Sequence, residues 1–195
     1  MYSFYALISR MKKNISRWAL MRNSYNENVQ EHSHMVAVLA HGLAVINREV
    51  FGGSADPDRC ASAALFHDAS EILTGDMPTP IKYHNREIKR AYKEVERLAS
   101  EKLIATLPEP LQNAYRPLLV DVDGETERIV KAADKLSAYI KCIEELKTGN
   151  GEFYQAAKQT EAKLEAYHMP EVDWFMENCI PAFKLTLDEL NFNIE

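Results

Sequence analysis

Apolar residues recur at helical spacing over most of this 195-residue chain. In the segment 28–50, five residues follow one another at steps of four, three, four and three: His32, Val36, Leu39, Leu43 and Ile46. Residues with this spacing share one face of an α-helix. Asn28 and Glu31 have the pattern of an N-terminal capping box, and two glycines at 52 and 53 predict the end of the helix. We therefore expect an amphipathic helix with His32 on its buried face.

The same periodicity predicts five further helices, over residues 56–75, 85–107, 125–147, 153–167 and 172–190. The two prolines of the segment 77–80 predict a loop there, and Pro108, Pro110 and Pro117 predict that the stretch they occupy is broken up. The chain shows no convincing run of alternating strand residues, no internal repeat and no long linker. The sequence therefore predicts one all-α domain, a helical bundle that spans residues 1–195.

Composition narrows the range of partners. The chain carries 29 acidic and 23 basic residues, a formal net charge of −6, which argues against binding a nucleic-acid polymer. Its three cysteines lie far apart without a CxxC spacing, which favours a reducing cytoplasm over a disulfide scaffold or a zinc ribbon. The longest apolar run, 35–46, is shorter than the ~20 residues that span a bilayer. We therefore expect a cytoplasmic protein that does not enter a membrane.

Four residues could together hold a metal ion: His32, His67, Asp68 and Asp134. Taken singly, His32 could be a hydrogen-bonded core histidine, and Asp134 could pair with Lys131 or Lys135 on its own helix. Taken together, two imidazoles and two carboxylates suit a divalent transition metal, with coordination positions left for water and a substrate oxygen. The histidines at positions 34, 41, 84 and 168 do not share this pattern.

Two acidic residues follow the His67-Asp68 pair in the sequence. Glu71 lies one helical turn beyond the pair, where it could act as a general acid or base beside the ion. Without a metal site it would be a solvated helix residue. Asp76 lies in the loop after Gly75, which could be the rim of a substrate site or a plain helix terminator. Composition alone favours the terminator.

These residues resemble the H…HD…D pattern of the HD-domain metal-dependent phosphohydrolases, an all-helical superfamily. Longer strings are similar to the bacterial HD-domain 5′-deoxynucleotidases: Arg17-Trp18, the segments 27–33, 67–71 and 74–80, and Ala133-Asp134. The resemblance covers most of the chain. It is strongest over residues 17–83 and 129–145 and weaker over 107–127.

The resemblance implies hydrolysis of deoxyribonucleoside 5′-monophosphates to deoxynucleosides and phosphate. It implies that His32, His67, Asp68 and Asp134 bind one divalent ion, such as cobalt, with manganese or another divalent ion as the alternative. Asp68 and Asp134 would also contact the substrate, and Asp68 and Glu71 would take part in catalysis. The implied assembly is a homodimer.

The resemblance also assigns the substrate pocket. Arg17 would orient the phosphate and assist catalysis, and Trp18 would contact the nucleotide and enforce the preference for the deoxy sugar. Without the motif, these two would be a surface arginine beside a core tryptophan. Four consecutive residues would line the pocket: Asp76, Met77, Pro78 and Thr79. Asp76 would lie near the sugar, and Met77 stands where relatives are expected to have leucine, an exchange that conserves volume.

Two other functions stay open. The chain could be another HD phosphohydrolase, acting on a nucleoside triphosphate, a cyclic nucleotide or a guanosine polyphosphate alarmone. Against this, the remaining histidines have the wrong spacing for a second metal, and few Lys or Arg residues cluster near the motif. The chain could also be a helical interaction protein that retains the site for structure or regulation. Metal binding alone would require neither Glu71 nor Arg17.

Overall fold

A computed structural model of the chain describes residues 1–14, 18–82 and 84–190. Its α-helices are α1 (Phe4–Ile8), α2 (Met11–Asn14), α3 (Val29–Glu49), α4 (Pro57–Phe66), α5 (Glu71–Thr74), α6 (Thr79–Lys82), α7 (Arg86–Ile104), α8 (Glu109–Leu119), α9 (Gly124–Lys147), α10 (Tyr154–Glu165) and α11 (Pro170–Asn178). Three 3₁₀ helices complete it: η1 (Gly151–Phe153), η2 (Ile180–Lys184) and η3 (Asp188–Leu190). The described residues contain no β-strand, which confirms the all-α prediction. None of the described helices combines the length and the apolar character that crossing a membrane requires.

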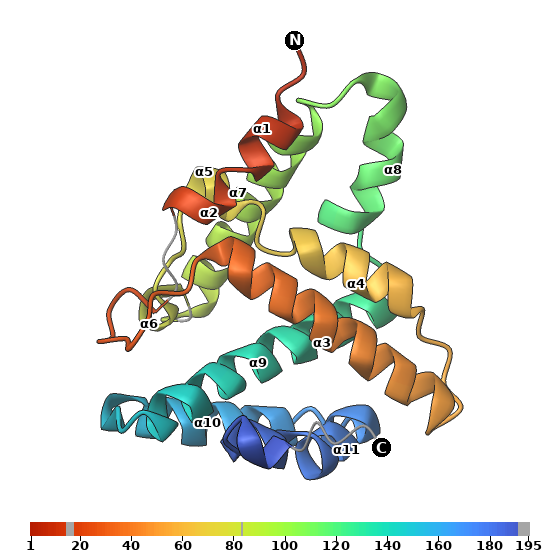
Figure 1. Cartoon of the computed structure of the whole chain (residues 1–195). Helices are drawn as coiled ribbons and strands as arrows, with labels where there is room; N and C mark the ends of the chain where they lie inside the picture. The colour runs from red at the N-terminus through yellow and green to blue at the C-terminus, as the bar shows by residue number, and fades with distance from the viewer. Residues whose placement is uncertain (15–17, 83, 191–195) are drawn as a thin grey trace.

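Helices α3, α4 and α9 pack against one another around the main hydrophobic core, α10 packs against α9, and α11 packs against α3 (Figure 1). Leu43 of α3, Ala64 of α4 and Leu136 of α9 are fully buried in this core. Leu164 and Val172 bring α10 and α11 into the same cluster. The ends of α4 and the middle of α9 are therefore held at fixed positions next to the inward face of α3.

The two longest helices begin where the sequence indicates. The Asn28 side chain accepts a hydrogen bond from the backbone N–H of Glu31 at 3.0 Å, and the Glu31 carboxylate accepts from the N–H of Asn28, also at 3.0 Å. This is the predicted capping box of α3. Asp123 caps α9 in the same manner, because its carboxylate accepts from the N–H of Thr126 at 2.9 Å. The predicted helices over 28–50 and 125–147 are confirmed.

The predicted helix over 56–75 is wrong in its second half, because it is interrupted directly after Phe66. From His67 to Ser70 the backbone forms turns, with hydrogen bonds between residues three apart such as Ala69 N–H to the Phe66 carbonyl at 3.0 Å. The His67 side chain contributes to this break. Its Nδ1 lies 2.7 Å from the carbonyl oxygen of Ala64, the acceptor that a regular α-helix gives to the N–H of Asp68. His67 and Asp68 therefore lie on a turn, where their side chains are not constrained to helical directions.

Two expectations about prolines and one about the C-terminal region are also wrong. The stretch with Pro108, Pro110 and Pro117 forms α8, because Pro108 is its N-cap and Pro110 lies in the first turn, where no N–H donor is needed. The predicted loop over 77–80 is shortened, since α6 begins at Thr79. The predicted helix over 172–190 ends early, because α11 stops at Asn178 and Pro181 cannot donate to continue it.

Candidate active site

Three separate segments bring the four predicted metal ligands together: His32 from α3, His67 and Asp68 from the turn after α4, and Asp134 from α9. The Nε2 atom of His32 lies 3.1 Å from Oδ1 of Asp134 and 3.7 Å from Oδ2 of Asp68. The Nε2 atom of His67 lies 3.2 Å from the same oxygen of Asp68. The packing of α3 against α4 and α9 thus converts a scattered pattern in the sequence into one cluster.

His32 is fully buried, and a hydrogen bond on the ring nitrogen that faces away from the cluster orients its imidazole. Its Nδ1 shares a hydrogen bond with the hydroxyl of Ser137, at 3.2 Å, one helical turn beyond Asp134 on α9. This contact directs Nε2 toward the two carboxylates. A partner on the far nitrogen of the ring is the usual way in which a metal-binding imidazole is oriented.

His67 is oriented in a similar way by the backbone. Its Nδ1–H donates to the carbonyl oxygen of Ala64, so Nε2 carries the lone pair that a metal ligand needs. The buried Nε2 atom faces Oδ2 of Asp68, at 3.2 Å. The two imidazole rings are 5.2 Å apart between their centroids. The arrangement leaves both Nε2 atoms facing the same small volume.

The electrostatics of this cluster favour a cation. Burial by itself lowers the pKa of His67, but the charges of Asp68 and Asp134 and the hydrogen bonds to Asp68 and Ala64 outweigh it and raise the pKa to about 9. Ligand atoms of His32, His67 and Asp68 all lie within 4.8 Å of one another. Two imidazole nitrogens and two carboxylates form a donor set that suits a divalent transition metal. The residues present therefore fit the implied ion.

The remaining histidines lie away from this cluster. The side chains at positions 34, 41, 84 and 168 are all exposed, in agreement with their exclusion on sequence grounds. Among the residues that the structure describes, no second group of His, Cys, Asp and Glu has the spacing of a metal site. The structure thus offers one candidate centre in its described part.

Glu71 is buried, with only 4% of its surface exposed, so it is not the solvated helix residue that was the alternative. It begins α5, and its backbone N–H donates to the carbonyl of Asp68 at 3.0 Å. This turn places Glu71 directly after the ligand pair. A buried carboxylate next to a metal site is a suitable general acid or base, because its surroundings exclude bulk water.

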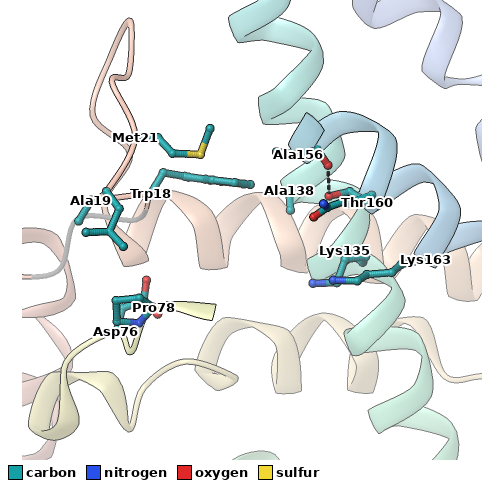
Figure 2. Close-up of a pocket in the computed structure, with 12 residues that line it drawn as sticks. Trp18, Ala19, Met21, Asp76, Pro78, Lys135, Ala138, Ala156, Thr160 and Lys163 are labelled. Atoms are coloured by element: carbon teal, nitrogen blue, oxygen red, sulfur yellow. Dashed lines mark hydrogen bonds between the residues drawn. The ribbon is translucent and has the colours of Figure 1, made fainter. Parts of the chain in front are cut away.

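A cavity of about 540 Å³ opens beside the cluster. It is lined by Trp18, Ala19, Leu20 and Met21, by Asp76 and Pro78, by Lys135 and Ala138 of α9, and by Ala156, Gln159, Thr160 and Lys163 of α10. Figure 2 shows Trp18 and the loop with Asp76 and Pro78 on two sides of this space. The side chain of Lys135 connects cavity and cluster, because its Nζ lies 3.8 Å from Oδ2 of Asp134.

Three of the predicted pocket residues therefore line the cavity, namely Trp18, Asp76 and Pro78. Met77 is half-buried and is not among the lining residues. Arg17 lies outside the described residues, as does the side chain of Thr79, whose backbone begins α6. Composition alone favours a simple helix terminator at Asp76. That description is incomplete, because the exposed side chain of Asp76 also lines the cavity.

Trp18 is held in an unusual conformation. Its φ of 58° is rare for a bulky residue, and such backbone strain persists only where the surroundings impose it. The Trp18 carbonyl accepts hydrogen bonds from Met21 N–H at 2.9 Å and from the Asn23 side chain at 3.1 Å. The indole packs on Phe153, with ring centroids 5.3 Å apart. The backbone contacts hold the turn at Trp18, and the packing on Phe153 places the indole as one wall of the cavity.

Sequence reasoning missed two cationic residues of the cavity, Lys135 and Lys163. The position of Lys135 directly after Asp134 was a signal, but it was interpreted only as an ion-pair partner on the same helix. Nothing local marks Lys163, which lies among alternating polar and apolar residues of α10. It enters the site only because α10 packs against α9.

The family model described as 5′-deoxynucleotidase YfbR-like matches residues 3–183 of the chain. A curated 5′-deoxynucleotidase of Photorhabdus laumondii is 49% identical, over 100% of this chain and 99% of that protein. One of Pectobacterium atrosepticum is 53% identical, over 96% of this chain and 95% of that protein. The crystal structure of an HD-domain phosphohydrolase from Listeria innocua superimposes with a TM-score of 0.79 at 26% identity, covering 93% of this chain and 88% of that one. The chain therefore belongs to the 5′-deoxynucleotidase YfbR-like family of HD-domain phosphohydrolases.

Proposed function

We propose that this chain is a metal-dependent 5′-deoxynucleotidase, which hydrolyses deoxyribonucleoside 5′-monophosphates to deoxynucleosides and phosphate. The observation that carries the proposal is the convergence of His32, His67, Asp68 and Asp134 beside the buried Glu71 and a nucleotide-sized cavity. The names of its curated relatives support the same activity.

The four converging residues would hold one divalent ion, with Co²⁺ as the first expectation and Mn²⁺ as the next. When bound, such an ion polarises the phosphate and makes a nearby water more acidic. The protein orients the ligands in advance, because Ser137 and the Ala64 carbonyl occupy the outer nitrogens of His32 and His67. Asp68 and Asp134 would also face the bound phosphate.

Hydrolysis requires a proton to leave the attacking water and a proton to reach the departing 5′-oxygen. Glu71 would accept the first and return it as the second, so that the P–O5′ bond breaks and the deoxynucleoside leaves as a neutral alcohol. Arg17 would orient the phosphate and balance its charge. Glu71, Asp68 and Arg17 are thus the proposed catalytic residues.

The sugar would bind between Trp18 and Asp76. The exposed carboxylate of Asp76 can accept a hydrogen bond from a sugar hydroxyl, with Met77, Pro78 and Thr79 extending this side of the pocket. The indole of Trp18, packed on Phe153, would exclude a 2′-hydroxyl by contact and by leaving it without a hydrogen-bond partner.

The proposal predicts which substrates release phosphate. With a divalent ion present, dAMP and the other deoxynucleoside monophosphates should react at least about tenfold faster than the matching ribonucleotides. A chelator should abolish the release, and added Co²⁺ or Mn²⁺ should restore it. A phosphate-release panel with all four bases on both sugars measures this.

Other results of the same panel would contradict the proposal. Equal rates on the two sugars would exclude a deoxynucleotidase. Faster reaction of dATP, a cyclic nucleotide or a guanosine polyphosphate would indicate another HD phosphohydrolase. No phosphate release with any of several divalent ions would favour a helical interaction protein.

Trp18→Ala is expected to reduce the deoxy-to-ribo ratio of kcat/KM by about tenfold, because the clash with the 2′-hydroxyl is lost. The matched control is Trp174→Ala, since Trp174 lies on α11 and does not line the cavity. Steady-state rates on dAMP and AMP with each variant provide the ratio. An unchanged ratio in Trp18→Ala would remove this residue from sugar discrimination.

We further infer that the chain acts as one domain, in the cytoplasm, and as a homodimer. The three cysteines are free, as suits a reducing compartment. One hydrophobic cluster joins α3 to α11, which supports a single domain. Light scattering of the purified protein would determine the oligomeric state.

A further inference from the structure

Two lysine side chains converge on the cavity from different helices. Lys135 extends from α9 and Lys163 from α10, and both line the space that Trp18 and Asp76 border. Figure 2 shows both side chains, drawn from the two helices, reaching toward this space. Two like charges that converge in this way repel each other unless an anion lies near both.

The surroundings of these two lysines differ from those of other lysines in α9 and α10. Lys131 pairs with Glu127, Lys141 with Glu145, and Lys158 lies 4.6 Å above the Tyr154 ring. Lys163, in contrast, forms no ion pair with any residue that the structure describes. Lys135 approaches a carboxylate only at 3.8 Å, beyond hydrogen-bond distance. The two ammonium groups therefore keep most of their capacity to bind an anion.

The position of Lys135 indicates which anion the two lysines would bind. Asp134 directs Oδ1 toward His32 Nε2, at 3.1 Å, and Oδ2 toward Lys135 Nζ, at 3.8 Å. Lys135 thus lies next to one of the cluster's own carboxylates. An oxyanion that contacts the cluster from the cavity side comes within reach of this ammonium group.

We propose that Lys135 and Lys163 bind the non-bridging oxygens of the substrate phosphate and form a cationic anchor in addition to the metal site. The proposal deepens the proposed function and rests on it, in that the phosphate belongs to a deoxynucleotide. It also explains how a chain with a net charge of −6 presents a positive surface to a dianion. Flexible ammonium groups act as point charges, so they can follow the phosphate as it changes shape.

The test replaces each lysine by methionine, which keeps the length of the side chain and removes its charge. Lys135→Met and Lys163→Met should each weaken the binding of inorganic phosphate about tenfold, as expected for a lost charged hydrogen bond. The KM for dAMP should rise by a similar factor, while the metal content stays that of the wild type. Lys135→Arg should recover much of the affinity that Lys135→Met loses.

The chain offers matched controls on the same two helices. Lys131→Met removes a charge from α9 and Lys158→Met removes one from α10, but neither residue lines the cavity. Both controls should bind phosphate as the wild type does. Lys163 lies on a different helix from the metal ligands, so its variant separates loss of the anchor from damage to the metal site.

Phosphate affinity is measured by calorimetry on chelator-treated and on metal-loaded protein, with inorganic phosphate as the probe and no turnover. If the wild type does not hydrolyse dAMP, the proposed function fails, but the calorimetric comparison still decides the role of the lysines. Unchanged phosphate affinity in the double variant would overturn the anchor. A changed preference among the four bases with unchanged phosphate affinity would also overturn it, because the lysines would then contact the base.

Discussion

Glu71→Gln is expected to lower kcat on dAMP at least about 100-fold, with the metal ion and the fold retained, as is usual when a general acid or base is removed. The amide has the shape of the carboxylate but cannot accept the proton of the attacking water. Glu71 is buried directly after the ligand pair, and the turn that connects it to Asp68 is made by backbone atoms, which the substitution does not touch. The loss should therefore appear in kcat and not in metal content.

The measurement combines steady-state kinetics with metal analysis of the same preparation. Glu177→Gln is the control, because Glu177 is exposed on α11, and it should leave both quantities unchanged. If Glu71→Gln lost its metal together with its activity, Glu71 would be a ligand or would shape the ligand set. A variant with near-normal kcat and a full metal content would exclude it as the acid or base.

Glu145→Gln is expected to lower the free energy of unfolding by about 3 kcal/mol, because it leaves the charge of Lys141 buried without a counter-charge. Both side chains are almost completely buried, and Lys141 Nζ lies 2.5 Å from Glu145 Oε1. The carboxylate also accepts hydrogen bonds from Ser24 N–H and from the Asn150 side chain, each at 2.9 Å. One substitution thus disturbs the contacts of Glu145 with Lys141, Ser24 and Asn150.

The same helix supplies a matched control, since Lys131 and Glu127 form an exposed pair with the same spacing on α9. Glu127→Gln should change stability by less than about 1 kcal/mol. Urea unfolding followed by circular dichroism measures both variants, compared at their midpoints. Equal effects of the two substitutions would show that burial of the Lys141-Glu145 pair adds nothing.

The hydrogen bond between Ser24 and Glu145 also connects this buried pair to the candidate active site. Ser24 lies in the segment that carries Trp18 to the cavity, so a weakened contact should loosen the indole wall. The KM for dAMP should therefore rise in Glu145→Gln even at temperatures where the variant is fully folded. Glu127→Gln should keep the wild-type KM.

The ionisation of Glu145 also makes the stability of the fold depend on pH. Burial by itself raises its pKa, but hydrogen bonds from Lys141, Asn150 and Ser24 outweigh it and lower the pKa to about 2, from an ordinary value of 4.5. A carboxyl group with a depressed pKa in the folded state stabilises the fold above its unfolded pKa. Its contribution is lost as the pH falls from about 4.5 toward 2. Stability curves of the wild type should decline over this range more steeply than those of Glu145→Gln.

Much of the local structure followed from neighbouring residues. The period of apolar positions and the Asn28-Glu31 box predicted α3 with His32 on its inner face, and Asp123 stands at the observed start of α9. These features depend on contacts within a few residues, so a sequence pattern describes them fully. The same locality explains the failures, since periodicity did not reveal the turn at His67, where a side chain takes the place of a backbone donor.

The sequence by itself determined the family, the helical class and the residue types of the proposed metal centre, because these depend on motifs and on local spacing. Only the tertiary structure decided which groups meet. It buried Glu71, packed Trp18 against Phe153 and placed Lys163 of α10 and Lys135 of α9 on the same cavity. These contacts join residues that are far apart in the sequence, and they depend on how the faces of different helices pack together. The periodicity of apolar residues within one helix does not report which other helix packs against it.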